Sequence, residues 1–294
     1  FQLIGGLTAG LAILIILLAW RLNVGPISLA FLSPYIERIL TTNPKSFRVG
    51  LDDTILTWAG WERTLDIRVL NVRAVDPDDK VIASVPELSL SLSARAMISG
   101  LVAPKSIDLF RPSLLLVRHA DGRFEVGSRQ GAVGSDRLLT LVLGALQSGP
   151  DPRNALSYLT RVVIVDADVT FEDRSLGITW RTPANQMSLV RTLTGIKGDI
   201  SFDLSVADQQ THVNIDGIYQ AADQKLKFGM EFGAIDLSVL SHLSPQLAPL
   251  AALDLPVQGT ITAAIGIDGT VDKIGFGLKG ASGRLRLPTP FAQV

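Results

Sequence analysis

The residues that could carry catalysis are few and lie far apart. The three histidines, His119, His212 and His242, are isolated in the sequence, and no motif supplies any of them with a catalytic partner. The run Gly280-Ala281-Ser282-Gly283 falls short of the G-x-S-x-G pattern and is typical of a turn. The chain has no cysteine, which excludes thiol catalysis, disulfide bonds and thiolate metal sites. Without a phosphate-binding loop, dinucleotide fingerprint or H-E-x-x-H motif, we expect a protein that is not an enzyme and has no cofactor.

Four carboxylates come closest to the spacing of a metal site. Asp166, Asp168, Glu172 and Asp173 could in principle hold Ca²⁺ through their oxygens. They belong to a stretch, 163–173, in which polar and apolar residues alternate, and alternation is typical of a strand with one wet face. We therefore expect solvated carboxylates here, with no metal bound.

The main remaining feature of the sequence is the pattern of its apolar residues. Alternation with a period of two dominates the chain after residue 22, and it predicts an antiparallel sheet with one apolar and one solvated face. Lys225–Phe232 shows the pattern best. The candidate residues for a shared apolar lining are Leu88, Leu90, Leu92, Val163, Val165, Val169, Phe202, Leu204, Val213, Ile215, Leu226, Phe228, Met230, Phe232, Ile261 and Ile265. On periodicity alone, such strands are also normal for a closed β-sandwich.

Four stretches interrupt the strand pattern: three predict helices, and the fourth, 94–101, predicts a short helix or a turn. They are 32–40, which contains the helix start Ser33-Pro34, then 94–101, 136–147 and the proline-broken 236–253. Asp121-Gly122 predicts a tight hairpin.

Small and polar residues indicate where the chain divides. Gly127–Ser135 and Gly149–Pro152 flank the third helix and separate two strand-rich parts. We expect an N-terminal segment 1–22, a β module 23–127, a helical linker 128–152 and a repeating antiparallel sheet 153–294. The repetition shows no closing signal, so we expect a longer protein.

The first residues have the composition of a membrane anchor. Leu3–Trp20 is uncharged and rich in Leu and Ile, and as a helix it would extend about 27 Å, close to the ~30 Å apolar core of a bilayer. A cleaved signal peptide usually has a shorter apolar region, and Ala19-Trp20-Arg21 is a poor cleavage site. The anchor residues are Leu3, Leu7, Leu11, Leu14, Leu18, Trp20 and Arg21.

Charge gives little information about partners or orientation. The net charge is −1, from 27 basic and 28 acidic residues without a basic patch, so we expect no nucleic acid as a partner. Arg21, Arg38, Lys45 and Arg48 follow the anchor and weakly favour a cytoplasmic body.

Several stretches of the chain resemble a known family. They are PISLAFLSPYIERIL (26–40), LDDTILTWAGWERTLDIRVLNVRAV (51–75), VPELSLSLSARAMISG (85–100), IDLFRPSLLLVRHADGRFEVG (107–127) and IDLSVLSHLSPQLAPLAALDLPVQGTITAAIGIDG (235–269). Together they resemble the AsmA-like envelope proteins of the TamB and YhdP group, with a chorein-type N-terminal module, in the alphaproteobacterial YhdP-like branch.

The resemblance implies a fold and a function. It implies a mainly β protein with one N-terminal transmembrane helix, whose elongated, curled antiparallel sheet forms a groove with a few short helices. The body would lie in the periplasm, attached to the bacterial inner membrane, and would bind or conduct phospholipid in envelope biogenesis. This location overrides the weak charge signal.

A second function class remains open. The chain could be a non-catalytic scaffold or assembly subunit of a larger membrane complex. Gly5-Gly6 and Gly10 would allow close approach of the anchor to helices of other inner-membrane proteins.

Overall fold

The computed structural model describes most of the chain after residue 26. It covers residues 10, 27–29, 31, 33–41, 48–57, 66–75, 81–121, 124–128, 131–133, 136–206, 209–242, 244–266 and 271–285. The strands are β1 (Ile27–Ser28), β2 (Arg48–Gly50), β3 (Asp53–Thr57), β4 (Asp66–Val75), β5 (Val81–Leu92), β6 (Pro104–Phe110), β7 (Ser113–Arg118), β8 (Phe124–Ser128), β9 (Gly131–Val133), β10 (Arg161–Asp173), β11 (Ile178–Arg191), β12 (Gly195–Val206), β13 (Gln209–Gln220), β14 (Lys225–Asp236), β15 (Leu253–Asp254), β16 (Pro256–Gly266), β17 (Val271–Gly280) and β18 (Arg284–Leu285). The helices are α2 (Ser33–Leu40), α3 (Ala94–Ile98), α4 (Asp136–Gln147) and the 3₁₀ helices η2 (Ala155–Tyr158), η3 (Leu237–His242) and η4 (Pro245–Ala252).

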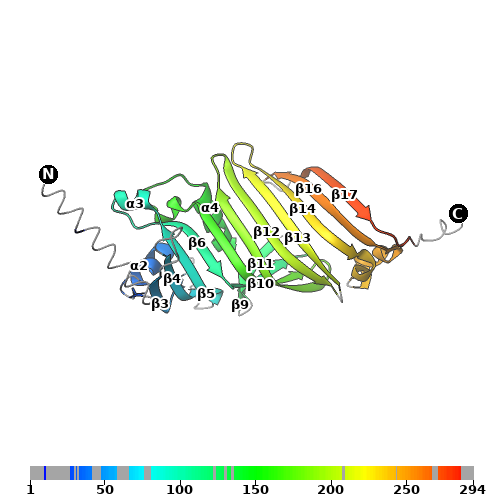
Figure 1. Ribbon diagram of the computed structural model, residues 1–294, viewed down its shortest axis with the longest axis horizontal. Coiled ribbons are helices and arrows are strands. Elements are labelled where there is room, and N and C mark those ends of the chain that lie inside the picture. Colours follow the sequence, from blue (N-terminus) through cyan, green and yellow to red (C-terminus); the bar gives the residue numbers. More distant parts are fainter. Residues whose placement is uncertain are drawn as a thin grey trace.

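One open sheet of sixteen strands forms the body of the described protein. Its strands follow the order β1-β3-β4-β5-β6-β10-β11-β12-β13-β14-β16-β17, with β2 beside β4 and a β7-β8-β9 branch beside β10. The strands lie side by side along an elongated body (Figure 1). The expected mainly β class is confirmed, and the sheet does not close into a sandwich or barrel.

The sheet is mixed, which corrects the expectation of a purely antiparallel one. β10 pairs in parallel with β6 over residues 161–165 and with β7 over residues 168–173. The described pairs elsewhere in the sheet are antiparallel. A parallel pair needs a long crossover connection, and here the segment containing α4 and η2 lies between β9 and β10. This segment, predicted as a linker, therefore returns the chain to the sheet beside β6.

A crease crosses the sheet where β6 gives way to β7. Arg111, between β6 and β7, and Asp166 of β10 have positive φ angles of 53° and 55°, and the register of β10 against β11 shifts on both sides of Ala167. The Asn185 side chain is buried in this crease and donates hydrogen bonds to the carbonyl oxygens of Ala167, at 2.9 Å, and Thr182. The crease is thus a β-bulge whose interrupted ladder is satisfied by a side-chain amide.

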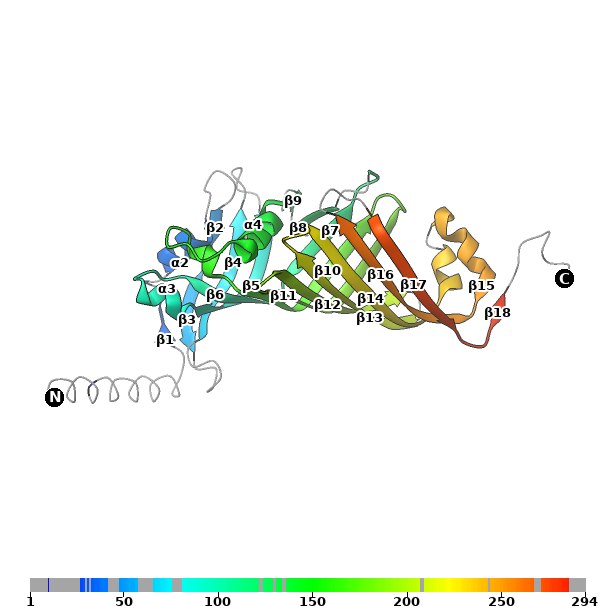
Figure 2. The same ribbon diagram turned by 90° about the horizontal axis from the view of Figure 1, so that it is seen from above.

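The helices pack on one face of the N-terminal strands. Ile36 of α2, Ala145 and Leu146 of α4 and Leu156 of η2 join a core with Ile67, Val69, Leu88 and Leu90 of the sheet. Figure 2 shows α4 and the β7-β8 hairpin on the same side of β12–β14. The four predicted helical stretches are confirmed: 236–253 becomes the broken pair η3 and η4, and the turn at Asp121 joins β7 to β8.

The predicted membrane anchor lies outside the described residues, except for Gly10. Among the residues that the structure describes, no helix is long and apolar enough to cross a membrane. The predicted boundaries at residues 22, 127 and 152 stay predictions, and the sheet continues from β6 and β7 into β10 across the last two.

Candidate functional site

An unbroken row of apolar side chains crosses ten neighbouring strands on one face of the sheet. Strand register aligns them, and residues paired in register share a face. The row, here called the apolar row, consists of Val69, Leu88, Leu109, Ile164, Met187, Ile200, Ile215, Met230, Ile261 and Phe276. A parallel row from Ile67 to Ile274 contains glycine at residues 198 and 217 and is otherwise apolar. We call the face that carries both rows the apolar face.

Burial on the apolar face is complete at Val69 of β4 and least on β17, and it varies on the strands between them. Val69 is 0% exposed because α2, α4 and η2 cover its end of the row. Ile200, Ile215, Met230 and Ile261 are only partly buried. On β17, Ile274 is 52% exposed and Phe276 is 72% exposed. The same face is thus a closed core at one end and an open apolar surface at the other.

The opposite face of β12–β14 is polar. Lys197, Asp199, Ser201 and Asp203 alternate with the apolar residues of β12, and each lies beside the matching face of β13. His212 lies in register with Asp203, and its Nδ1 is 2.7 Å from Asp203 Oδ1 while its Nε2 is 3.1 Å from Asn214 Oδ1. This is the ordinary solvated side of an antiparallel sheet.

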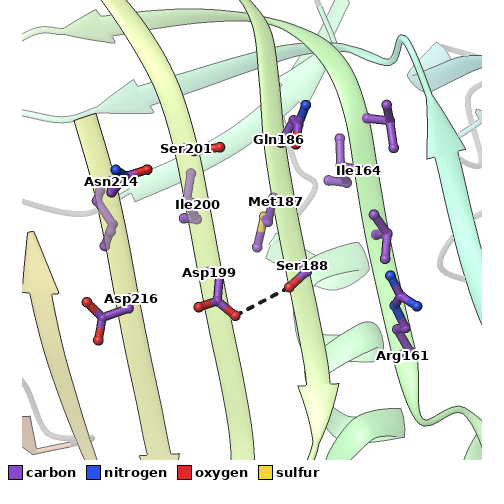
Figure 3. A pocket seen from close by; sticks show the side chains of 13 residues that line it. Arg161, Ile164, Gln186, Met187, Ser188, Asp199, Ile200, Ser201, Asn214 and Asp216 are labelled. Carbon is purple, nitrogen blue, oxygen red and sulfur yellow. Dashed lines mark hydrogen bonds between the residues drawn. The ribbon is translucent and has the colours of Figure 1, made fainter. Parts of the chain in front are cut away.

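A shallow hollow of about 470 Å³ lies on this polar face, over β10–β13 (Figure 3). Asp199 and Asp216 are in register on adjacent strands, and Ser188 donates a 3.4 Å hydrogen bond to Asp199 Oδ2. Lys197 forms a 3.2 Å ion pair with the other oxygen of Asp199. The described residues hold no group of three or more His, Asp or Glu side chains that could bind a metal ion. The hollow is open and combines charges of both signs, and its hydroxyl–carboxylate contact, Ser188 to Asp199, is long at 3.4 Å.

Most of the predicted lining residues share the apolar face of β12–β16. The register brings these residues together there: Phe202, Leu204, Val213, Ile215, Leu226, Phe228, Met230, Phe232, Ile261 and Ile265. Val213 is 4% exposed, Leu226 is 40% exposed, and the other eight side chains are partly buried.

The predicted lining residues nearer the N-terminus have other positions. Leu88 and Leu90 lie on the apolar face but are buried in the core beneath the helices, and Leu92 packs against that core. Val163 and Val165 lie on the polar face and line the hollow there, which corrects the prediction.

The bulge at Asp166 is the physical reason for that correction. It inserts one extra residue between Ile164 and Ala167, so a strict two-residue period fails across it. Ile164 before the bulge and Val169 after it therefore lie on the apolar face, as the registers with Met187 and Thr182 show.

Three of the four carboxylates considered for Ca²⁺ accept hydrogen bonds from arginine side chains. Asp168 accepts two hydrogen bonds from Arg181, and Glu172 accepts one of 2.8 Å from Arg174. Arg118 donates to Asp173 at 3.0 Å, across the parallel pair of β7 and β10.

Among the carboxylates that the structure describes, Asp173 has a clear pKa shift. Burial favours its neutral form, but hydrogen bonds from the Leu176 amide, Arg118 and the Ser175 amide outweigh burial, so the pKa of Asp173 lies below its ordinary 3.8. Asp173 is therefore an ionised structural tie between β7, β10 and the following turn.

Sequence reasoning missed several residues of the apolar face. Ile164, Met187 and Ile200 belong to the apolar row, and Ile274, Phe276 and Leu278 form its exposed end. The alternation of Ile274, Phe276 and Leu278 with Lys273 and Lys279 was a usable signal. Met187 gave a weaker one, because Pro183 interrupts its strand at the crease.

Leu3, Leu7, Leu11, Leu14, Leu18, Trp20 and Arg21 lie outside the described residues. The other two histidines sit apart from His212: His119 follows β7 and His242 ends η3. In comparisons with protein-family models, curated proteins and solved structures, the chain matches none.

Proposed function

We propose that this protein binds the acyl chains of membrane phospholipid on the apolar face of β12–β17, without catalysis. In this proposal it is an AsmA-like envelope protein, held at the bacterial inner membrane by Leu3–Trp20, with its body in the periplasm. The observation that carries the proposal is the apolar row, which continues from a closed core to the edge strand β17 with partly exposed side chains.

The physical chemistry of an acyl chain fits such a surface. Burial contributes about 0.8 kcal/mol per CH₂, so exposing a 16-carbon tail to water costs on the order of 12 kcal/mol of free energy. A protein that takes the tail from a bilayer must cover it to avoid this cost. A surface lined by Ile, Met and Phe supplies that shielding without specific polar partners. The charged residues of the same strands lie on the opposite face, where they keep the sheet soluble.

A scaffold role is the second candidate, and the edge strand β17 favours it. β17 pairs with β16 on one side, and no described strand pairs with its other side. Exposed edges with apolar side chains are typical sites for strand addition by another chain. In that case a protein segment, not lipid, would cover Ile274, Phe276 and Leu278.

Matched substitutions on β13 test the lipid proposal. Ile215 lies on the apolar face, whereas Ile218 lies on the polar face, 43% exposed and in register with Lys197 and Lys227. Ile215→Asp places a charge where acyl chains would bind, and Ile218→Asp places the same charge among lysines. The measurement is binding of a fluorescent phospholipid to each purified variant, with circular dichroism as the check of folding.

We expect Ile215→Asp to weaken lipid binding at least tenfold and Ile218→Asp to leave it within twofold of wild type. Equal binding by all three proteins would reject the apolar face as the lipid site. No binding by folded wild-type protein, with capture of an apolar peptide strand instead, would favour the scaffold role.

A further inference from the structure

Helix α4 stands at the boundary between the closed and the open parts of the apolar face. Ala145 and Leu146 are buried against the core, and Leu141, Val142 and Leu143 pack on it while partly exposed. The same core includes Ile196 of β12, with Leu189 and Tyr219 packed at its margin. The next residues along the sheet on that face include Phe228 and Ile265, which are partly buried.

Arg191 fastens the C-terminal end of α4 to the sheet. It lies in register with Ile196, on the apolar face, and its Nε donates a 2.8 Å hydrogen bond to the carbonyl oxygen of Leu146. Its Nη2 donates to the carbonyl oxygens of Ala145 and Ser157, the latter at 2.9 Å. The last four carbonyl groups of a helix have no intrahelical hydrogen-bond donor. Arg191 supplies donors to two such groups of α4.

The charge of Arg191 also suits this position. The last turn of α4 contains no basic residue, and a cation is favourable at the negative end of a helix dipole. Arg191 of the sheet therefore supplies the positive charge that is missing from the C-terminal turn of α4. A single side chain thus ties α4, η2 and β11 together at the margin of the open surface.

We propose that α4 is the end wall of the acyl-chain site and that Arg191 is the positioning residue that holds this wall, so that the pair limits the length of chain that binds. This inference rests on the proposed function. The apolar row continues under α4 through Leu109 and Leu88 to Val69, so the sheet itself does not end the apolar surface. The helix ends it, by occupying the place that a longer chain would take.

A chain-length series with wild-type protein tests the wall. Lysophospholipids with one headgroup and single tails from 8 to 20 carbons are titrated against the purified protein. Each added CH₂ should raise affinity about fourfold, which corresponds to 0.8 kcal/mol, until the tail reaches α4. Beyond that length affinity should stay level. A steady rise over the whole series would overturn the proposal.

Arg191→Met tests the positioning role, with Arg181→Met as its matched control on the same strand. Arg181 lies on the polar face, exposed and paired with Asp168. We expect Arg191→Met to move the plateau to longer tails, with unchanged affinity for the shortest ones, and Arg181→Met to keep the wild-type plateau. An unchanged plateau in folded Arg191→Met would contradict the role of Arg191.

Two outcomes separate this inference from the proposed function. Absence of binding for every tail length would reject the lipid site as a whole. Binding without a plateau would keep the lipid site and reject the wall. If Arg191→Met does not fold, the wild-type series still decides whether a wall exists.

Discussion

Val69 and Phe276 stand at the two ends of one row of in-register apolar side chains, yet Val69 is 0% exposed and Phe276 is 72% exposed. The strands between them repeat the same alternation, so the sheet alone does not account for the difference. The helices account for it, because α2, α4 and η2 cover the first strands of the row. The apolar face thus belongs to a protein core from β4 to Ile196 of β12, carries mostly partly buried side chains on β12–β16, and is exposed on β17.

The same Leu→Ala substitution should lower stability by different amounts in the closed core and on the open part of the apolar face. Leu146 of α4 is 0% exposed in the core, and Leu226 of β14 is 40% exposed on the open part of the apolar face. We expect Leu146→Ala to lower the free energy of unfolding by about 2–5 kcal/mol, as for other buried leucines. Leu226→Ala should cost less than about 1 kcal/mol, because less apolar area is lost from contact. Urea denaturation of lipid-free protein measures both, and equal costs would mean that a closed core covers β14.

Asp173 should make stability depend on acid pH. Its pKa is lower in the folded protein than the ordinary 3.8, so its contribution is complete above that value and is lost as pH falls through the folded pKa. We expect Asp173→Asn to be less stable by about 1–3 kcal/mol at pH 7, since it weakens buried hydrogen bonds and the pair with Arg118.

The difference between wild type and Asp173→Asn should shrink as pH falls below about 4, because the unfolded wild-type chain binds a proton at this carboxyl before the folded protein does. Thermal unfolding of both proteins between pH 7 and pH 3 checks the sign. A difference that grows as pH falls would show that Asp173 is not the ionised tie described above.

The edge strand β17 should promote self-association. Ile274, Phe276 and Leu278 are exposed on one face of a strand whose outer edge no described strand covers. Natural edge strands avoid aggregation through charges that point toward such faces. We expect Phe276→Lys to reduce the fraction of large species in size-exclusion chromatography, with little change in Tm. Lys279→Ala, on the polar face of the same strand, should not reduce it.

The strand pattern of the C-terminal half could be predicted from the sequence. A period of two puts Phe228, Met230 and Ile261 on one face, and the register agrees because β12–β16 are long and antiparallel. The helix at 136–147 could likewise be predicted, because its apolar segment is flanked by glycine, serine and proline residues.

Other features depend on contacts that local sequence does not encode. The bulge at Asp166 reverses the orientation of Val163 and Val165 relative to a regular strand, and a positive φ at an aspartate has no reliable local signature. The parallel pairing of β10 follows from the path of a long crossover. Leu88 and Leu90 are buried in a core to which α2, α4 and η2 contribute, and the pattern of β5 alone cannot show this.

Photo-crosslinking at adjacent residues of β14 tests the central claim most directly. A benzophenone amino acid in place of Phe228 lies on the apolar face, and the same probe in place of Lys227 lies on the polar face. The full chain, carrying one probe at a time, is irradiated in native membranes, and adducts are identified by mass spectrometry. If the apolar face binds acyl chains, phospholipid adducts form at residue 228 and none form at residue 227. Equal lipid adducts at both residues, or only protein adducts at residue 228, would contradict this claim.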